Sequence, residues 1–133
     1  SPAGRLLVGT SFSGGKVPSE SVAEGSDVML IHGNGQDSVG LARLIENTRA
    51  LKACRGQPIV VNEDDHFEFE REDCNCLTAL KHGASWGYFD YRMEGETWAE
   101  GYQSVPTDWS VSTDRKRGFF NLMAELTGSD KRF

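Results

Sequence analysis

Short apolar runs alternate along the chain with longer segments that carry a helical pattern. Four runs have the length and composition of strands: residues 5–12 (RLLVGTSF), 27–35 (DVMLIHGNG), 58–63 (PIVVNE) and 84–89 (ASWGYF). Their apolar residues follow one another without polar residues between them, which is typical of strands in sheets covered on both faces. We therefore predict four buried strands.

Each predicted strand is followed by a segment that can form a helix. After the second strand, Asp37 or Ser38 can cap a helix that Gly56 would stop. Its apolar face consists of Leu41, Leu44, Ile45, Thr48 and Leu51. The other expected helices are a short one within 18–26, one within 70–83 that closes on Lys81, His82 and Gly83, and a last one with Phe119, Leu122, Met123 and Leu126 on one face. This alternation predicts an α/β fold with a parallel sheet, either open and doubly wound or part of a barrel.

Length and composition indicate one compact domain over residues 1–133. Hydrophobic residues make up 38% and charged residues 26% of the chain, so a core can form. A net charge of -6 argues against nucleic-acid binding, and no apolar run approaches the roughly 18 residues of a membrane span. Nucleotide-binding glycine motifs are absent, and we expect the three cysteines (Cys54, Cys74 and Cys76) to be free thiols without chemistry.

Chemically active side chains follow the predicted strands where these end. The run PIVV leads directly into Asn62 and Glu63, His32 ends the strand before it, and Trp86 lies in the strand after it. In a β/α barrel the carboxyl ends of all strands open onto one face, where catalytic groups gather. A carboxylate there can meet positive charge at an anomeric carbon, while an indole can stack on a sugar ring. The pattern favours a carbohydrate site.

Taken together, the motifs resemble the C-terminal half of a clan A glycoside hydrolase, the barrel group of cellulases, mannanases and β-galactosidases. The resemblance implies a partial (β/α)8 barrel, with four β/α units that correspond to strands five to eight. It implies Glu63 as the nucleophile at the end of the seventh strand, His32 as an orienting residue on the sixth, and Trp86 as the aromatic residue of the eighth. The other candidate substrate contacts are Asn34, Asn62, Trp98 and Trp109. An oligo- or polysaccharide substrate, no cofactor or metal, and an extracellular or periplasmic location would follow.

One catalytic group of that family has no counterpart in the chain. Retaining glycosidases use two carboxylates about 5 Å apart. In clan A the acid/base follows an asparagine at the end of the fourth strand, before the region that this chain resembles. A full barrel also needs at least about 200 residues. We therefore expect a partial sequence that lacks the N-terminal half of the barrel and shows no hydrolysis alone.

Other interpretations of these residues remain open. A metal-dependent barrel hydrolase could use His32, Glu63, Asp65 and His66, and a non-catalytic half-barrel could bind carbohydrate. Glu63 could also be an ordinary loop carboxylate, Trp86 a core residue, and the run from Asp64 to His66 a solvated turn. An upstream strand that ends in Asn-Glu would favour the glycosidase, and an upstream His-x-His motif the metal enzyme.

Overall fold

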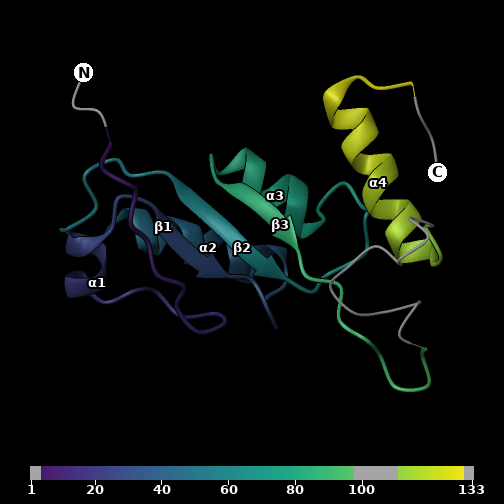
Figure 1. The fold of residues 1–133 in the computed structure, drawn as a ribbon, viewed down its shortest axis with the longest axis horizontal. Helices are drawn as coiled ribbons and strands as arrows, with labels where there is room; N and C mark the ends of the chain where they lie inside the picture. The colour runs from purple at the N-terminus through teal and green to yellow at the C-terminus, as the bar shows by residue number, and fades with distance from the viewer. Residues whose placement is uncertain (1–3, 98–110, 131–133) are drawn as a thin grey trace.

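A three-stranded parallel sheet in the order β1-β2-β3 forms the centre of the protein (Figure 1). The computed structural model describes residues 4–97 and 111–130. Its elements are α1 (Glu20–Gly25), β1 (Met29–His32), α2 (Ser38–Arg49), β2 (Ile59–Asp64), α3 (Asn75–Lys81), β3 (Ser85–Tyr88) and α4 (Asp114–Thr127). The α/β class and the order of these three parallel strands are as predicted.

The prediction of a strand at residues 5–12 was wrong. This segment is irregular, and Leu6 and Leu7 are 86% and 75% exposed. Its main-chain contact with the sheet region is at Val8, whose carbonyl accepts hydrogen bonds from the amides of Asp27 and Val28, just before β1. The hydrogen bonds of Val8 lie before β1, and β1 itself pairs with β2. The sheet of the described residues therefore has three strands, where four were expected.

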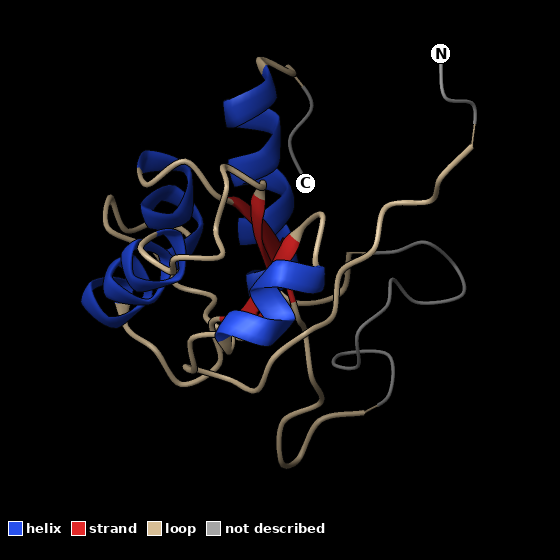
Figure 2. Ribbon diagram, turned by 90° about the vertical axis from the view of Figure 1, so that its left-hand side faces the viewer, coloured by secondary structure: helices blue, strands red, loops and turns tan. Residues whose placement is uncertain are grey.

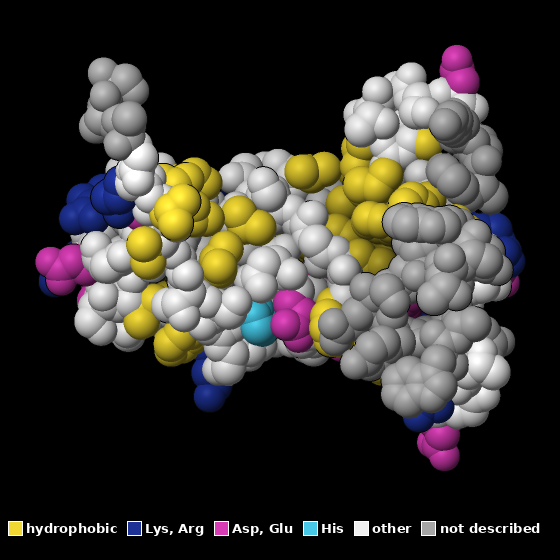
Figure 3. Space-filling model, viewed as in Figure 1, with side chains coloured by type: hydrophobic (Ala, Val, Ile, Leu, Met, Phe, Trp, Pro, Cys, Tyr) yellow, Lys and Arg dark blue, Asp and Glu magenta, His cyan; other side chains and the backbone are white. Residues whose placement is uncertain are grey.

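The helices in residues 4–97 and 111–130 cover one face of the sheet and leave the other without helices. On the covered face the strands bury Met29, Ile31, Ile59 and Val61, which pack against Leu41, Leu44 and Ile45 of α2, Ala79 of α3 and Ala23 of α1. The strand residues that alternate with them are less buried: Leu30 and Val60 are half-buried, and Asn62 is exposed. Figure 2 shows α2 and α3 on one side of the strands and the N-terminal segment on the other. We call the side without helices the open face, and Figure 3 views it with its hydrophobic side chains in yellow.

Helix boundaries differ from prediction where other contacts compete with the helix. Asp37 caps α2 as expected, accepting a hydrogen bond from the Gly40 amide at 2.7 Å. The helix nevertheless ends at Arg49, well before Gly56, because the amides of Lys52 and Ala53 donate hydrogen bonds to the Glu20 carboxylate of α1 instead of continuing the helix. Helix α3 begins only at Asn75, after turns at residues 68–74, and Leu126 on α4 is 44% exposed although it was expected on the buried face.

Helix α4 packs through a separate aromatic cluster. Its Phe119 lies within ring contact of Phe69, Trp86 and Tyr88, and Leu122 is buried beside them. The cluster attaches α4 to β3 and to the segment after β2. None of the helices among the described residues is long and apolar enough to cross a membrane.

Candidate functional site

The carboxyl end of β2 contains one extra residue relative to both neighbouring strands. From Val61 to Glu63, β2 advances two residues, while β1 advances one, from Ile31 to His32. From Val61 to Asp64, β2 advances three residues while β3 advances two, from Trp86 to Tyr88. The irregularity is a bulge at Asn62 and Glu63, a feature that re-aims side chains.

The bulge brings Glu63 beside His32, its partner in the register with β1. His32 Nδ1 lies 3.6 Å from Glu63 Oε2, and the two side chains are 17% and 31% exposed. Because His32 alternates with the buried Ile31, it lies on the open face of the sheet. The structure therefore brings together the two predicted catalytic residues at the carboxyl ends of adjacent parallel strands.

Two candidate substrate-binding asparagines lie at the same end of the sheet. Asn62 is exposed and donates from Nδ2 to the hydroxyl of Ser11 at 3.2 Å. Asn34 follows β1, in the turn before α2. Its Oδ1 and the Nε2 of His32 are buried atoms without a hydrogen-bond partner among the described residues. Buried polar atoms of this kind are rare unless a ligand or water satisfies them.

Trp86 lies on the other face of the sheet. It pairs with Val61, and partners in a parallel register point to the same face, which here is the helix-covered one. Its indole N–H donates to Asp64 Oδ2 at 2.8 Å, and its ring stacks on Tyr88 with centroids 6.1 Å apart. The structure does not bring this indole to the face that carries Glu63. Trp98 and Trp109 lie outside the described residues.

Asp64 is the residue of this region that the sequence pattern did not single out by itself. Expected in a solvated turn, it is fully buried instead, with 0% exposure. Its Oδ2 accepts hydrogen bonds from Asn75 and Trp86, and its Oδ1 accepts from the backbone amide of His66 and lies 2.8 Å from His66 Nδ1. The one signal in the sequence was that Asp64 immediately follows the strand PIVVNE, with no loop between them.

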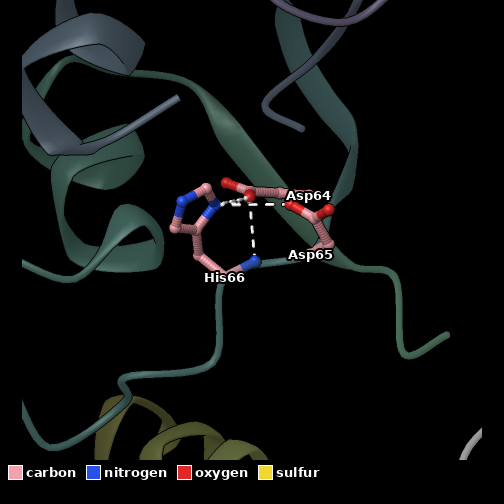
Figure 4. Close-up of side chains that lie close together, drawn as sticks. All are labelled: Asp64, Asp65 and His66. Atoms are coloured by element: carbon pink, nitrogen blue, oxygen red, sulfur yellow. Dashed lines mark hydrogen bonds and ion pairs between the residues drawn. The ribbon is translucent and has the colours of Figure 1, made fainter. Parts of the chain in front are cut away.

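Asp64, Asp65 and His66 are also the group of described residues whose ligand atoms lie close enough for a metal ion, all within 4.8 Å of one another. In Figure 4 the imidazole of His66 turns toward both carboxylates. However, both oxygens of Asp64 already accept hydrogen bonds from protein groups. The contact of His66 Nδ1 with Asp64 Oδ1, at 2.8 Å, takes the place that a metal ion between these two residues would occupy.

The two cysteines near this site, Cys74 and Cys76, are buried. The structure contains no disulfide among the described residues. Burial, together with the nearby Cys74 and Asp64, raises the pKa of the Cys76 thiol to about 12. At neutral pH this group is a protonated, small hydrophobic side chain.

Comparisons with protein-family models, curated proteins and solved structures give no match to the chain. Its function must therefore be argued from the geometry at the ends of β1 and β2.

Proposed function

We propose that the chain supplies the nucleophile half of the active site of a retaining glycoside hydrolase that acts on β-linked carbohydrate. The observation that carries the proposal is the pair formed by Glu63 and His32. The two residues end adjacent parallel strands, on the face of the sheet that the helices leave open, with 3.6 Å between Nδ1 and Oε2. Catalytic groups of β/α barrels occupy this position.

The one-sided layer of helices supports a barrel over an open doubly wound sheet. Doubly wound sheets carry helices on both faces, whereas a barrel carries them on the outside only. The segment 5–12, which corresponds to the fifth strand in this proposal, contacts the open face: a Cβ on Gly9 would come 3.4 Å from the Leu30 side chain, and Asn62 donates to the hydroxyl of Ser11. In this proposal the partner of the open face is an N-terminal half with the remaining β/α units.

The proposed reaction follows the double displacement of retaining glycosidases. The Glu63 carboxylate attacks the anomeric carbon, the bond to the leaving oxygen breaks, and that oxygen takes a proton from a carboxylic acid of the N-terminal half. The resulting glycosyl ester is hydrolysed by a water molecule whose proton returns to that same carboxylate. His32, whose Nδ1 lies 3.6 Å from Glu63 Oε2, orients the carboxylate.

Sugar hydroxyls are the groups that suit the polar atoms around Glu63. His32 Nε2 and Asn34 Oδ1 are buried without a partner among the described residues, and Asn62, the residue before Glu63 on β2, is exposed. A hydroxyl group can donate to one such atom and accept from another. Trp86 is left out of the substrate contacts, because its indole packs on the helix-covered face.

The test is replacement of Glu63 by Gln in the full-length protein. Loss of the negative charge at nearly constant shape should lower glycosidase activity by several orders of magnitude while sugar binding persists. A mechanism-based 2-fluoro sugar should form an ester with Glu63 and no other residue. Asp65→Asn, the same change on a carboxylate two positions along, is the matched control and should keep its activity.

Two results would overturn the proposal. Near-normal turnover by the Glu63→Gln variant would exclude Glu63 as the nucleophile. Loss of activity on treatment with a chelator, restored by a divalent metal, would favour the metal-dependent hydrolase instead. The 133-residue chain alone should be inactive, because the second carboxylic acid comes from the other half.

A further inference from the structure

We infer that Asp64 is a positioning residue that fixes the direction of the Glu63 carboxylate. The inference rests on the proposed function, because it assigns Asp64 a role in the reaction of its neighbour. Asp64 itself is buried on the helix-covered face and does not touch a substrate on the open face.

Side-chain hydrogen bonds join Asp64 to three separate parts of the fold. Asn75 Nδ2, in the first turn of α3, and Trp86 Nε1, on β3, donate to its Oδ2 at 2.9 and 2.8 Å. The amide of His66 donates to its Oδ1 at 3.1 Å, and His66 Nδ1 lies 2.8 Å from the same oxygen. The carboxylate thereby holds the segment after β2 against β3 and α3.

Main-chain hydrogen bonds extend this attachment to both predicted catalytic residues. The Glu63 carbonyl accepts from the Gly33 amide at 2.7 Å, and Gly33 directly follows His32. The Asp64 carbonyl accepts from the Phe89 amide at 2.8 Å. Peptide groups on both sides of Asp64 are therefore bonded, one to the end of β1 and one to the end of β3.

Close packing at Gly33 ties the end of β1 to Asp64 itself. A Cβ at Gly33 would come 2.5 Å from Asp64 Oδ2 and 2.7 Å from its Cγ, which leaves no room for a side chain. A shift of the Asp64 carboxylate toward Gly33 would therefore press on the backbone that directly follows His32. The spacing of His32 and Glu63 depends on a group that neither side chain contacts.

An ionised carboxylate suits this position because it only accepts hydrogen bonds. Four N–H groups point to its two oxygens when His66 carries its proton on Nδ1. An Asn side chain of the same shape would turn its NH2 group toward two of these donors. Asp64→Asn is therefore a disruptive change, whereas Asp65→Asn is mild, because Asp65 has one longer contact within the described part of the chain, 3.5 Å from its Oδ1 to His66 Nδ1.

The test compares Asp64→Asn, Asp65→Asn and Glu63→Gln in the full-length protein. Asp64→Asn should lower kcat about 100-fold, the scale of a misplacement of about 1 Å, with KM within about twofold of the wild-type value. The rate of Glu63 labelling by the fluoro sugar should fall by the same factor at unchanged reagent affinity. Asp65→Asn should change neither quantity.

The outcomes separate this inference from the proposed function. If Glu63→Gln is inactive but Asp64→Asn keeps wild-type kcat, the positioning role is wrong and the nucleophile stands. If Asp64→Asn raises KM and lowers the active fraction without changing kcat per folded molecule, its role is structural only. If Glu63→Gln is active, the proposed function itself fails.

A second variant decides the case in which Asp64→Asn does not fold. Asn75→Ala removes one of the four donors to Asp64 and leaves the carboxylate in place. It should lower kcat and the labelling rate in the same direction but less. Unchanged kcat in a folded Asn75→Ala protein would overturn the inference.

Discussion

Replacement of Arg115 by Met should detach helix α4 from the segment that follows β3. Arg115, in the first turn of α4, donates from Nε to Asp90 Oδ1 at 2.6 Å and forms an ion pair with Glu96. Met keeps an unbranched side chain of similar volume but has no N–H group. The change therefore removes the bonds to two carboxylates at nearly constant volume.

The expected loss of stability follows from the burial of these groups. The side chains of Arg115 and Asp90 are only 9% and 8% exposed, and removing one partner of a buried pair costs about 3–5 kcal/mol. Lys116 Nζ remains 3.3 Å from Asp90 Oδ2, and Glu96, at 19% exposure, can regain water. Both effects place the loss at the low end, about 3 kcal/mol.

Native-state hydrogen exchange of the α4 amides measures this loss directly, because it reports local as well as global opening. Arg117→Met is the matched control: Arg117 lies on the same helix, is 41% exposed, and pairs with the 98% exposed Asp114. It should change the opening free energy by no more than about 0.5 kcal/mol. A loss below about 1 kcal/mol in Arg115→Met, or an equal loss in the control, would refute the burial argument.

Two further predictions concern ionisable groups. Hydrogen bonds from Arg115 lower the pKa of Glu96 below the ordinary glutamate pKa of about 4.3. Ionised Glu96 therefore stabilises the fold at pH values above that ordinary pKa, and this stabilisation is lost as the pH falls through the lowered pKa. Acid titration of the unfolding free energy should lack this loss in Arg115→Met. Because its pKa is raised to about 12, Cys76 should resist iodoacetamide at pH 8 in the folded chain, whereas the half-buried Cys54 should react. Denaturant should make all three cysteines reactive. Equal alkylation rates for Cys54 and Cys76 in the folded chain would contradict the burial of Cys76.

Local signals allowed the best predictions from sequence. The cap at Asp37 and the buried face of α2 were confirmed, because both depend on residues within a few positions of one another. The core strands β1, β2 and β3 were also placed correctly within a few residues, since each is a short apolar run bounded by polar residues. Parallel pairing followed from the helices between them.

Predictions that depend on distant partners were less successful. The run RLLVGTSF has the composition of a strand, but a strand also needs a partner edge and a covering layer, and Leu6 and Leu7 lie exposed. The end of α2 depends on Glu20. Its carboxylate accepts a hydrogen bond from the amide of Lys52, 32 residues further along the chain. Neither the lack of a covering layer over residues 5–12 nor the hydrogen bond between Glu20 and Lys52 leaves a pattern in the local sequence.

The position of the candidate site depends on the bulge in β2. In a regular strand the side chains alternate, so Glu63 would follow Val61 onto the helix-covered face, and Asp64 would point to the open face with Asn62. The extra residue shifts this alternation by one: Glu63 pairs with His32, while Asp64 pairs with Tyr88 and is buried. A sequence that reads Asn-Glu-Asp-Asp offers several carboxylates and no indication of where the bulge falls. The contacts of Asp64 with Asn75 and Trp86 decide it, because they hold one carboxylate in the core and leave its neighbour on the open face.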